Sequence, residues 1–294
     1  MRAYPINAKL TASLIFAGVL VTSLTYAQPI TDGFMKGKGN GSLIVSYSWE
    51  RYDEFFFADT RMDAPPPYGG QITTRSISLY GVVGLTDDID IVLNIPYIIA
   101  EGEGQAPPEQ EVSGPQDASV FIKWCPLFIE TDAGNLSFLG ALGFATPLSD
   151  YSADAVLSIG NQATRADLRL ISHFLSNAGI FGELQAGYSL RSNDVPNATL
   201  LSAKLGYAAE KFYIDLWSET QISDSDAPDI GQAPFFSETS SPFSQTRVNY
   251  TQIGASLFVP VVSGFGVSAG VGQYVSGRNV GLATRFSGGL VYSL

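Results

Sequence analysis

The sequence predicts an all-β protein, a transmembrane antiparallel up-and-down β-barrel of about twelve strands. Three features predict this fold. The end of the chain alternates between apolar and small or polar side chains, a segment near residue 42 alternates in the same way, and long and short connections follow each other in turn. Charged residues make up only 15% of the chain, too few to cover a barrel in water, so the apolar faces should point into lipid. A soluble β-sandwich or a lipocalin-like fold is the alternative.

The first and last strands should pair and close the barrel. In residues 281–294, Leu290 and Tyr292 lie on the apolar parity, and Trp49 lies on the matching parity of residues 42–54. A terminal strand leaves unpaired backbone donors and acceptors, which need a partner strand. We therefore expect these two segments to pair with their apolar side chains facing outward.

Residues 1–27 have the features of a cleaved signal peptide. Arg2 and Lys9 supply positive charge, residues 10–21 are apolar, and a small-x-small pattern ends at Ala27. A single membrane anchor is the alternative, although the apolar stretch is short for a span. Two domains are predicted to follow. Residues 28–41 form a short periplasmic segment that is too small to plug a pore by itself, and residues 42–294 form an outer-membrane barrel.

Composition excludes several other functions. The formal charge is −12, so we expect no nucleic acid as a partner. Cys125 is the only cysteine, which excludes an internal disulfide and a cysteine metal cluster. The glycines of Gly102-Glu103-Gly104 precede no predicted helix, so they are no nucleotide-binding motif. We expect neither a cofactor nor a metal site.

The alternation of long and short connections predicts the topology of the barrel. Connections after odd-numbered strands include the long stretches 55–70, 100–114, 147–164 and 223–247, whereas those after even-numbered strands are all brief. This alternation is typical of a barrel with both termini on the periplasmic side and long loops outside the cell. The strands are predicted near residues 42–54, 71–84, 88–99, 115–127, 135–146, 165–175, 179–191, 197–208, 211–222, 248–260, 264–276 and 281–294.

Inward-facing charges should form two rows in the lumen. The lower row contains His173, Glu183, Lys204 and Asp215, and the outer row contains Glu50, Arg75 and Arg285. Such rows either form a constriction that selects solutes, or pair with one another and stiffen the barrel. Aromatic and other polar side chains share the lumen, which suits small, partly hydrophobic solutes. The remaining residues of the predicted solute path are Tyr80, Phe121, Lys123, Arg169, Phe181, Trp217, Glu219 and Tyr250.

The predicted outer loops are acidic. Their carboxylates would hold divalent cations against lipopolysaccharide, or are simply solvated, since no twelve-residue calcium loop is present. These acidic residues are Glu101, Glu103, Glu109, Glu111, Asp150, Asp154, Asp224, Asp226 and Asp229.

Catalytic residues are not predicted. His173 is the only histidine, and both Ser172 and Ser176 face away from it by strand parity. A serine nucleophile would therefore have to come from a distant part of the chain.

Several short motifs resemble one known family. They are Gly84-Leu85-Thr86-Asp87 followed by Leu93-Asn94-Ile95-Pro96-Tyr97, then Gly114-Pro115-Gln116-Asp117 leading to Lys123, and Phe144-Ala145-Thr146-Pro147 through Asp150-Tyr151. Together they resemble the bacterial outer-membrane barrels named for the meta-pathway of phenol degradation, which are similar in broad terms to long-chain fatty-acid transporters. Here Thr precedes Pro147, where that family more often has Thr after Pro. The resemblance spans most of 42–294 and implies a channel for hydrophobic or aromatic compounds, with no catalytic residues.

We therefore expect a non-enzymatic outer-membrane channel of a Gram-negative bacterium that admits small hydrophobic or aromatic molecules passively. A narrow non-specific porin is the main alternative, ahead of a barrel lipid hydrolase and of a structural or adhesive barrel. The expected partners are outer-membrane lipids and lipopolysaccharide, the solute, and the barrel-assembly machinery, which would bind the C-terminal strand.

Overall fold

The computed structural model describes residues 30–294 except 64–69, 104–110, 156 and 231–242. Within this part of the chain, strands and one short 3₁₀ helix, η2 (Phe243–Gln245), are the regular elements. No helix among these residues is long and apolar enough to cross a membrane. The strands that build the barrel wall are β1 (Gly41–Tyr52), β4 (Ile72–Gly84), β5 (Ile89–Gly102), β6 (Glu111–Pro115), β7 (Asp117–Thr131), β8 (Gly134–Pro147), β9 (Arg165–Ser176), β10 (Ile180–Arg191), β11 (Ala198–Ala208), β12 (Tyr213–Ser223), β13 (Asn249–Val262), β14 (Phe265–Arg278) and β16 (Thr284–Ser293).

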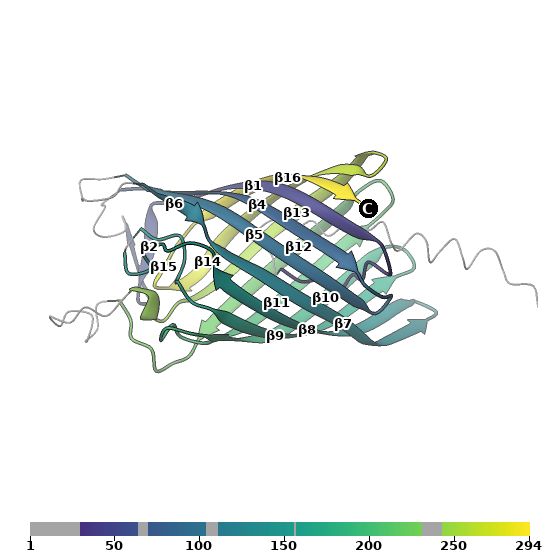
Figure 1. Ribbon diagram of the computed structural model, residues 1–294, viewed down its shortest axis with the longest axis horizontal. Coiled ribbons are helices and arrows are strands. Elements are labelled where there is room, and N and C mark those ends of the chain that lie inside the picture. Colours follow the sequence, from purple (N-terminus) through teal and green to yellow (C-terminus); the bar gives the residue numbers. More distant parts are fainter. Residues whose placement is uncertain (1–29, 64–69, 104–110, 156, 231–242) are drawn as a thin grey trace, which may run out of the picture.

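These strands form one closed antiparallel barrel (Figure 1). The strand β5 pairs with β6 over one half of its length and with β7 over the other, so β6 and β7 act as one interrupted strand and the described wall has twelve strands. Closure depends on β1, which pairs with β4 on one side and with β16 on the other. Trp49 lies opposite Phe286, and Glu50 lies opposite Arg285. The predicted pairing of the first and last strands is confirmed.

The two ends of the barrel differ. The connections after β1, β5, β8, β10, β12 and β14 lie at one end, which we call the loop end. The brief connections lie at the opposite turn end, together with the C-terminal Leu294. The predicted sorting of long and short connections is therefore present. The strands of the wall begin close to their predicted positions, because strand length and turn chemistry are local properties of the sequence.

The structure has a small second sheet at the loop end that we did not predict from the sequence. It contains β2 (Glu54–Phe57), β3 (Thr60–Asp63) and β15 (Val280–Gly281), in the order β15-β2-β3. Residues 54–57 form a hairpin with β3, and Phe56 also pairs with Val280. The partner strand β15 is far away in the sequence, so no local pattern indicates this sheet.

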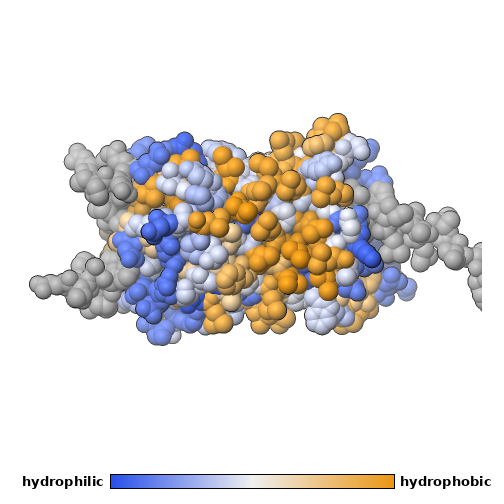
Figure 2. Space-filling model, viewed as in Figure 1, coloured by the Kyte–Doolittle hydropathy of each residue, from blue (hydrophilic) through white to orange (hydrophobic). Residues whose placement is uncertain are grey.

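The apolar side chains point away from the lumen. Leu290 is 66% exposed and Tyr292 is 39% exposed on the outer wall, whereas Ser46 and Ser48 of the neighbouring strand are buried inside. Figure 2 shows apolar residues over much of the wall and hydrophilic residues gathered at the loop end. This is the apolar-out arrangement of a barrel whose wall contacts lipid.

Replacing Leu170 with arginine should therefore lower the free energy of unfolding by about 2–4 kcal/mol, because a charge near the bilayer midplane carries that cost. Leu170 lies at the middle of β9 and is 65% exposed on the outer wall. Urea unfolding of the protein in phospholipid vesicles measures the effect, with Leu170→Ala as the control for lost side-chain volume. Equal stability of the two variants would contradict a lipid-facing wall.

Candidate functional site

The N-terminal segment lies inside the barrel. Thr31 and Asp32 are buried, and two of the segment's backbone groups bond to β10. The Gly33 amide donates to Glu183 Oε2 at 2.7 Å, and Gln185 donates to the Thr31 carbonyl at 2.8 Å. We expected residues 28–41 to be too small to plug a pore by themselves, and in the structure the segment packs against side chains of the barrel wall. Residues 31–36 close the turn end together with lumen side chains, and we call this layer the floor.

A buried charge cluster holds the floor in place. Lys123 Nζ lies 3.2 Å from Asp32 Oδ1 and 3.4 Å from Asp90 Oδ2, and it donates to the Phe34 carbonyl at 2.6 Å. The side chains of Lys123 and Asp90 are only 2% and 0% exposed. The Lys36 amide also donates to Asp90, at 3.1 Å. Buried charges are tolerated when they are paired and hydrogen-bonded in this way.

Aromatic side chains fill the rest of the floor. The Phe34 ring lies edge-on to His173 at 4.4 Å and to Phe181 at 5.2 Å between ring centroids. Phe121 and Phe258 belong to the same buried apolar cluster, with Tyr80 beside them. We predicted Tyr80, Phe121 and Phe181 as part of the solute path, and the structure packs them into a buried apolar cluster instead. The reason is that Phe34 enters the lumen and completes a cluster that the barrel wall alone leaves open.

The lower charge row assembles as predicted. His173 lies opposite Glu183 in the strand register, with His173 Nδ1 3.2 Å from Glu183 Oε2, and Glu183 lies opposite Lys204. Asp215 accepts a hydrogen bond from the Tyr213 hydroxyl at 2.7 Å. Trp217 is buried opposite Lys204 in the register. These residues belong to the floor rather than to an open constriction.

The outer charge row is only partly correct. Arg285 Nε lies 2.7 Å from Glu50 Oε2 across the closing seam of the barrel. Arg75, however, shares the parity of Ile77, and it forms an ion pair with Glu101, which also lies on the outer parity of its strand. The prediction that Arg75 lines the lumen is wrong, because in the register its partner on β1 is the outward-facing Trp49 rather than Glu50.

A polar cavity of about 310 Å³ lies between the floor and the loop end, and we call it the chamber. The predicted residues Arg169, Glu219, Tyr250 and Arg285 line it. Sequence reasoning missed other charged and aromatic residues of the lining, although they share the inward parity of residues that it selected. These are Asp117, Arg165, Asp167 and Tyr274.

An apolar cavity of about 760 Å³ lies at the loop end, and we call it the vestibule. Ile98 and Tyr274 line both the vestibule and the chamber, so the two spaces adjoin. The small sheet of β2 and β15 contributes to it, which explains why the vestibule could not be predicted. Its apolar lining includes Tyr52, Phe55, Phe57, Phe243 and Val280.

The long connection after β12 is anchored beside the vestibule. Arg278 Nε donates to Asp229 Oδ1 at 2.6 Å, and the Asn279 amide donates to the same carboxylate at 2.9 Å. The hydrogen bonds from Arg278 hold the pKa of the Asp229 carboxyl below its ordinary value. Asp229 therefore forms an internal ion pair with Arg278. Glu109 of the predicted acidic loops lies outside the described residues, which hold no group of three or more His, Cys, Asp or Glu placed to bind a metal.

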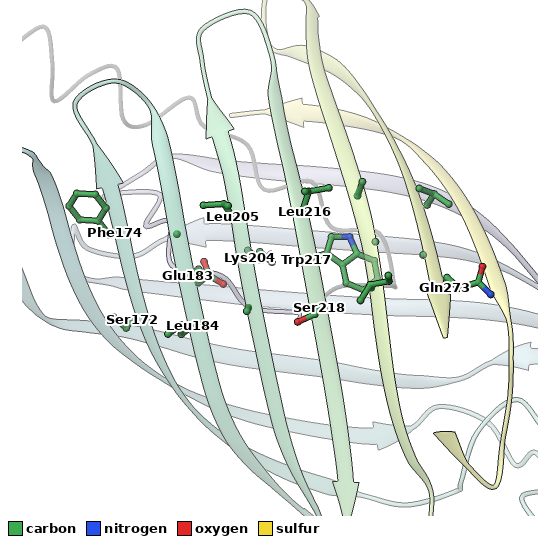
Figure 3. Close-up of a pocket in the computed structure, with 17 residues that line it drawn as sticks. Ser172, Phe174, Glu183, Leu184, Lys204, Leu205, Leu216, Trp217, Ser218 and Gln273 are labelled. Carbon is green, nitrogen blue, oxygen red and sulfur yellow. The ribbon is translucent and has the colours of Figure 1, made fainter. Parts of the chain in front are cut away.

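A further recess of about 870 Å³ lies on the wall between β9 and β14 (Figure 3). Leu184, Leu205 and Leu216 line it and are 61–66% exposed, so the recess opens toward lipid. Ser172 lies on this outer side, whereas His173 points into the lumen, as strand parity predicted. We therefore assign the solute path to the chamber and the vestibule rather than to this larger recess.

The geometry defines a class of protein: a closed twelve-stranded antiparallel β-barrel of the outer-membrane type, with an internal floor, chamber and vestibule. The fold is similar to the crystal structure of an outer membrane channel from Pseudomonas putida F1, with a TM-score of 0.66 and 13% identity over 93% of this chain and 100% of that chain. The NanC porin gives a TM-score of 0.48 with 8% identity over 86% of this chain and 100% of that one. The translocator domain of the autotransporter NalP from Neisseria meningitidis gives 0.47 with 11% identity over 88% and 90%.

At these identities the likeness concerns the fold. No model of a protein family matches the chain, and no curated protein matches it.

Proposed function

We propose that this protein is an outer-membrane channel for the passive uptake of small hydrophobic or aromatic molecules. The observation that carries the proposal is the sequence of spaces inside the barrel, in which an aromatic vestibule at the loop end adjoins a smaller polar chamber. Burial of an apolar solute against aromatic side chains is favourable by about 25 cal/mol per Å². The polar groups of the chamber would then orient the solute below.

The dimensions support a small solute. The chamber volume of about 310 Å³ is near the lower limit of small-molecule sites. The solute path that we propose runs from the vestibule past Tyr274 into the chamber, and the floor controls passage toward the turn end. The resemblance to the meta-pathway barrels supports the same class of solute.

The cellular setting is part of the proposal. Residues 1–27, which lie outside the described part of the chain, would act as a cleaved signal peptide. The C-terminal strand β16 would present its outward side chains to the barrel-assembly machinery before it pairs with β1. The exposed apolar wall would contact outer-membrane lipids, and the loop end would face lipopolysaccharide.

Uptake into liposomes tests the solute preference. Protein-containing liposomes should take up a phenolic glucoside faster than a disaccharide of similar size, after subtraction of the rate in protein-free liposomes. Phe57→Ser should reduce the phenolic rate and leave the sugar rate unchanged, because Phe57 contributes an apolar face of the vestibule. Equal rates for the two solutes would indicate a non-specific narrow porin instead.

A further inference from the structure

Most charges that line the chamber have partners within the protein. Arg285 pairs with Glu50, and Arg165 Nε lies 3.4 Å from Asp167 Oδ2. The carboxylate of Asp117 accepts a hydrogen bond from the Tyr151 hydroxyl. These pairs account for four of the six charged side chains in the lining, namely Asp117, Arg165, Asp167 and Arg285.

Arg169 and Glu219 are the two that remain. Among the described residues, neither forms an ion pair or a side-chain hydrogen bond. Arg169 is only 7% exposed, and its Nε finds no acceptor in this part of the protein. Arg169 Cζ lies over the Phe121 ring, 5.9 Å from its centroid. A buried guanidinium Nε without an acceptor is costly, and it points to a group that binds beside Arg169.

Arg169 and Glu219 interact electrostatically across the chamber but form no direct ion pair, and the strand register explains why. Arg169 on β9 lies between Ala141 on β8 and Gly187 on β10, neither of which offers a side-chain acceptor. Glu219 stands on β12, so β10 and β11 separate the two charges along the wall. Both side chains line the same cavity.

We infer that the chamber binds a small zwitterion, whose carboxylate pairs with Arg169 and whose ammonium group pairs with Glu219. The inference rests on the proposed channel function, because the ligand reaches the chamber through the vestibule. The lining balances three cations, Arg165, Arg169 and Arg285, against three acids. A singly charged anion would pair with Arg169 but would be repelled by the carboxylates of Glu219 and Asp167. A zwitterion can pair with both Arg169 and Glu219.

The apolar part of the chamber lining indicates which zwitterions would bind. Tyr250 and Tyr274 lie edge-on to each other at 5.4 Å between ring centroids, and both line the cavity. Leu200 and Pro96 add aliphatic surface. An α-amino acid with an aromatic side chain combines the two charges with a ring that these residues would cover, and it fits a volume of about 310 Å³.

Calorimetric titration of the full chain in detergent tests the inference with three probes that share a phenyl ring: phenylalanine, 3-phenylpropanoate and phenethylamine. Phenylalanine should bind at least about tenfold more tightly than either singly charged probe, since hydrogen bonds to charged groups contribute on the order of 1.5–3 kcal/mol. Arg169→Gln and Glu219→Gln should each weaken phenylalanine binding by about tenfold. Arg169→Gln should not weaken the binding of phenethylamine, and Glu219→Gln should not weaken the binding of 3-phenylpropanoate.

Two controls separate a lost contact from a lost fold. Arg61→Gln removes a charge from an exposed ion pair with Glu54 at the loop end and should leave all three affinities unchanged. Arg169→Lys keeps the positive charge and should retain part of the phenylalanine affinity. Heat-modifiable migration in electrophoresis shows whether each variant forms a folded barrel.

Two results would overturn the inference. One is 3-phenylpropanoate binding as tightly as phenylalanine, which would indicate a simple anion site. The other is phenylalanine binding unchanged in both Gln variants. If either occurs while the phenolic glucoside still enters liposomes, the zwitterion inference fails and the channel proposal stands. The channel proposal itself fails if the phenolic glucoside does not enter liposomes that contain this protein and does not enter liposomes that contain a variant without the floor.

Discussion

Replacing Lys123 with methionine should lower the free energy of unfolding by about 3–5 kcal/mol, the usual cost of removing one partner from a buried ion pair. The substitution leaves Asp32 and Asp90 with their carboxylates buried and without their shared cation. Methionine has a similar length, so the loss of packing is small. Urea unfolding in phospholipid vesicles, followed by tryptophan fluorescence, measures the change.

The same substitution at Lys38 is the matched control. Lys38 stands in the same N-terminal segment, but its side chain is exposed. Lys38→Met should change the stability by less than about 0.5 kcal/mol, as is usual for surface positions. The double variant Lys123→Met with Asp32→Asn should recover part of the loss, because it removes one of the two unpaired charges. Equal stability of Lys123→Met and Lys38→Met would show that the floor is not held by this cluster.

Replacing Gly33 with valine should expel the N-terminal segment from the lumen and raise the uptake of small solutes. A Cβ at this position would lie 2.3 Å from His173 Cβ and 2.4 Å from His173 Cγ. The Gly33 amide is also fixed by its bond to Glu183, so the backbone has no room to retreat. An overpacking cost of about 3 kcal/mol changes the ratio of open to closed barrels by about a hundredfold.

Liposome uptake and limited proteolysis together measure this opening. The released segment should become accessible to protease, since it loses the burial that protects it. Gly140→Val is the matched control, because a Cβ at Gly140 meets nothing within 4 Å. A Gly33→Val variant that resists protease and takes up solute at the original rate would contradict the floor as the barrier.

Local alternation was enough to predict the wall of the barrel. In β16 and β1 the side chains alternate with a period of two, and a one-residue slip would turn every apolar side chain toward the lumen. That constraint determines both the register and the closing pair, including Glu50 opposite Arg285. The same parity rule, applied without exception, would have placed Arg75 outside and Arg165 inside.

The sequence by itself therefore determined that this protein is a twelve-stranded barrel with apolar side chains outward, because strand periodicity and turn residues act over a few positions. Only the tertiary structure decided what fills the lumen. Asp32 contacts Lys123, which lies 91 residues away in the sequence, and Gly33 contacts Glu183, which lies 150 residues away. No periodic pattern in the segment 31–36 predicts either contact. The tertiary structure also decided that Arg169 and Glu219 form no direct ion pair, because the distance between two inward charges depends on how the strands curve around a shared cavity.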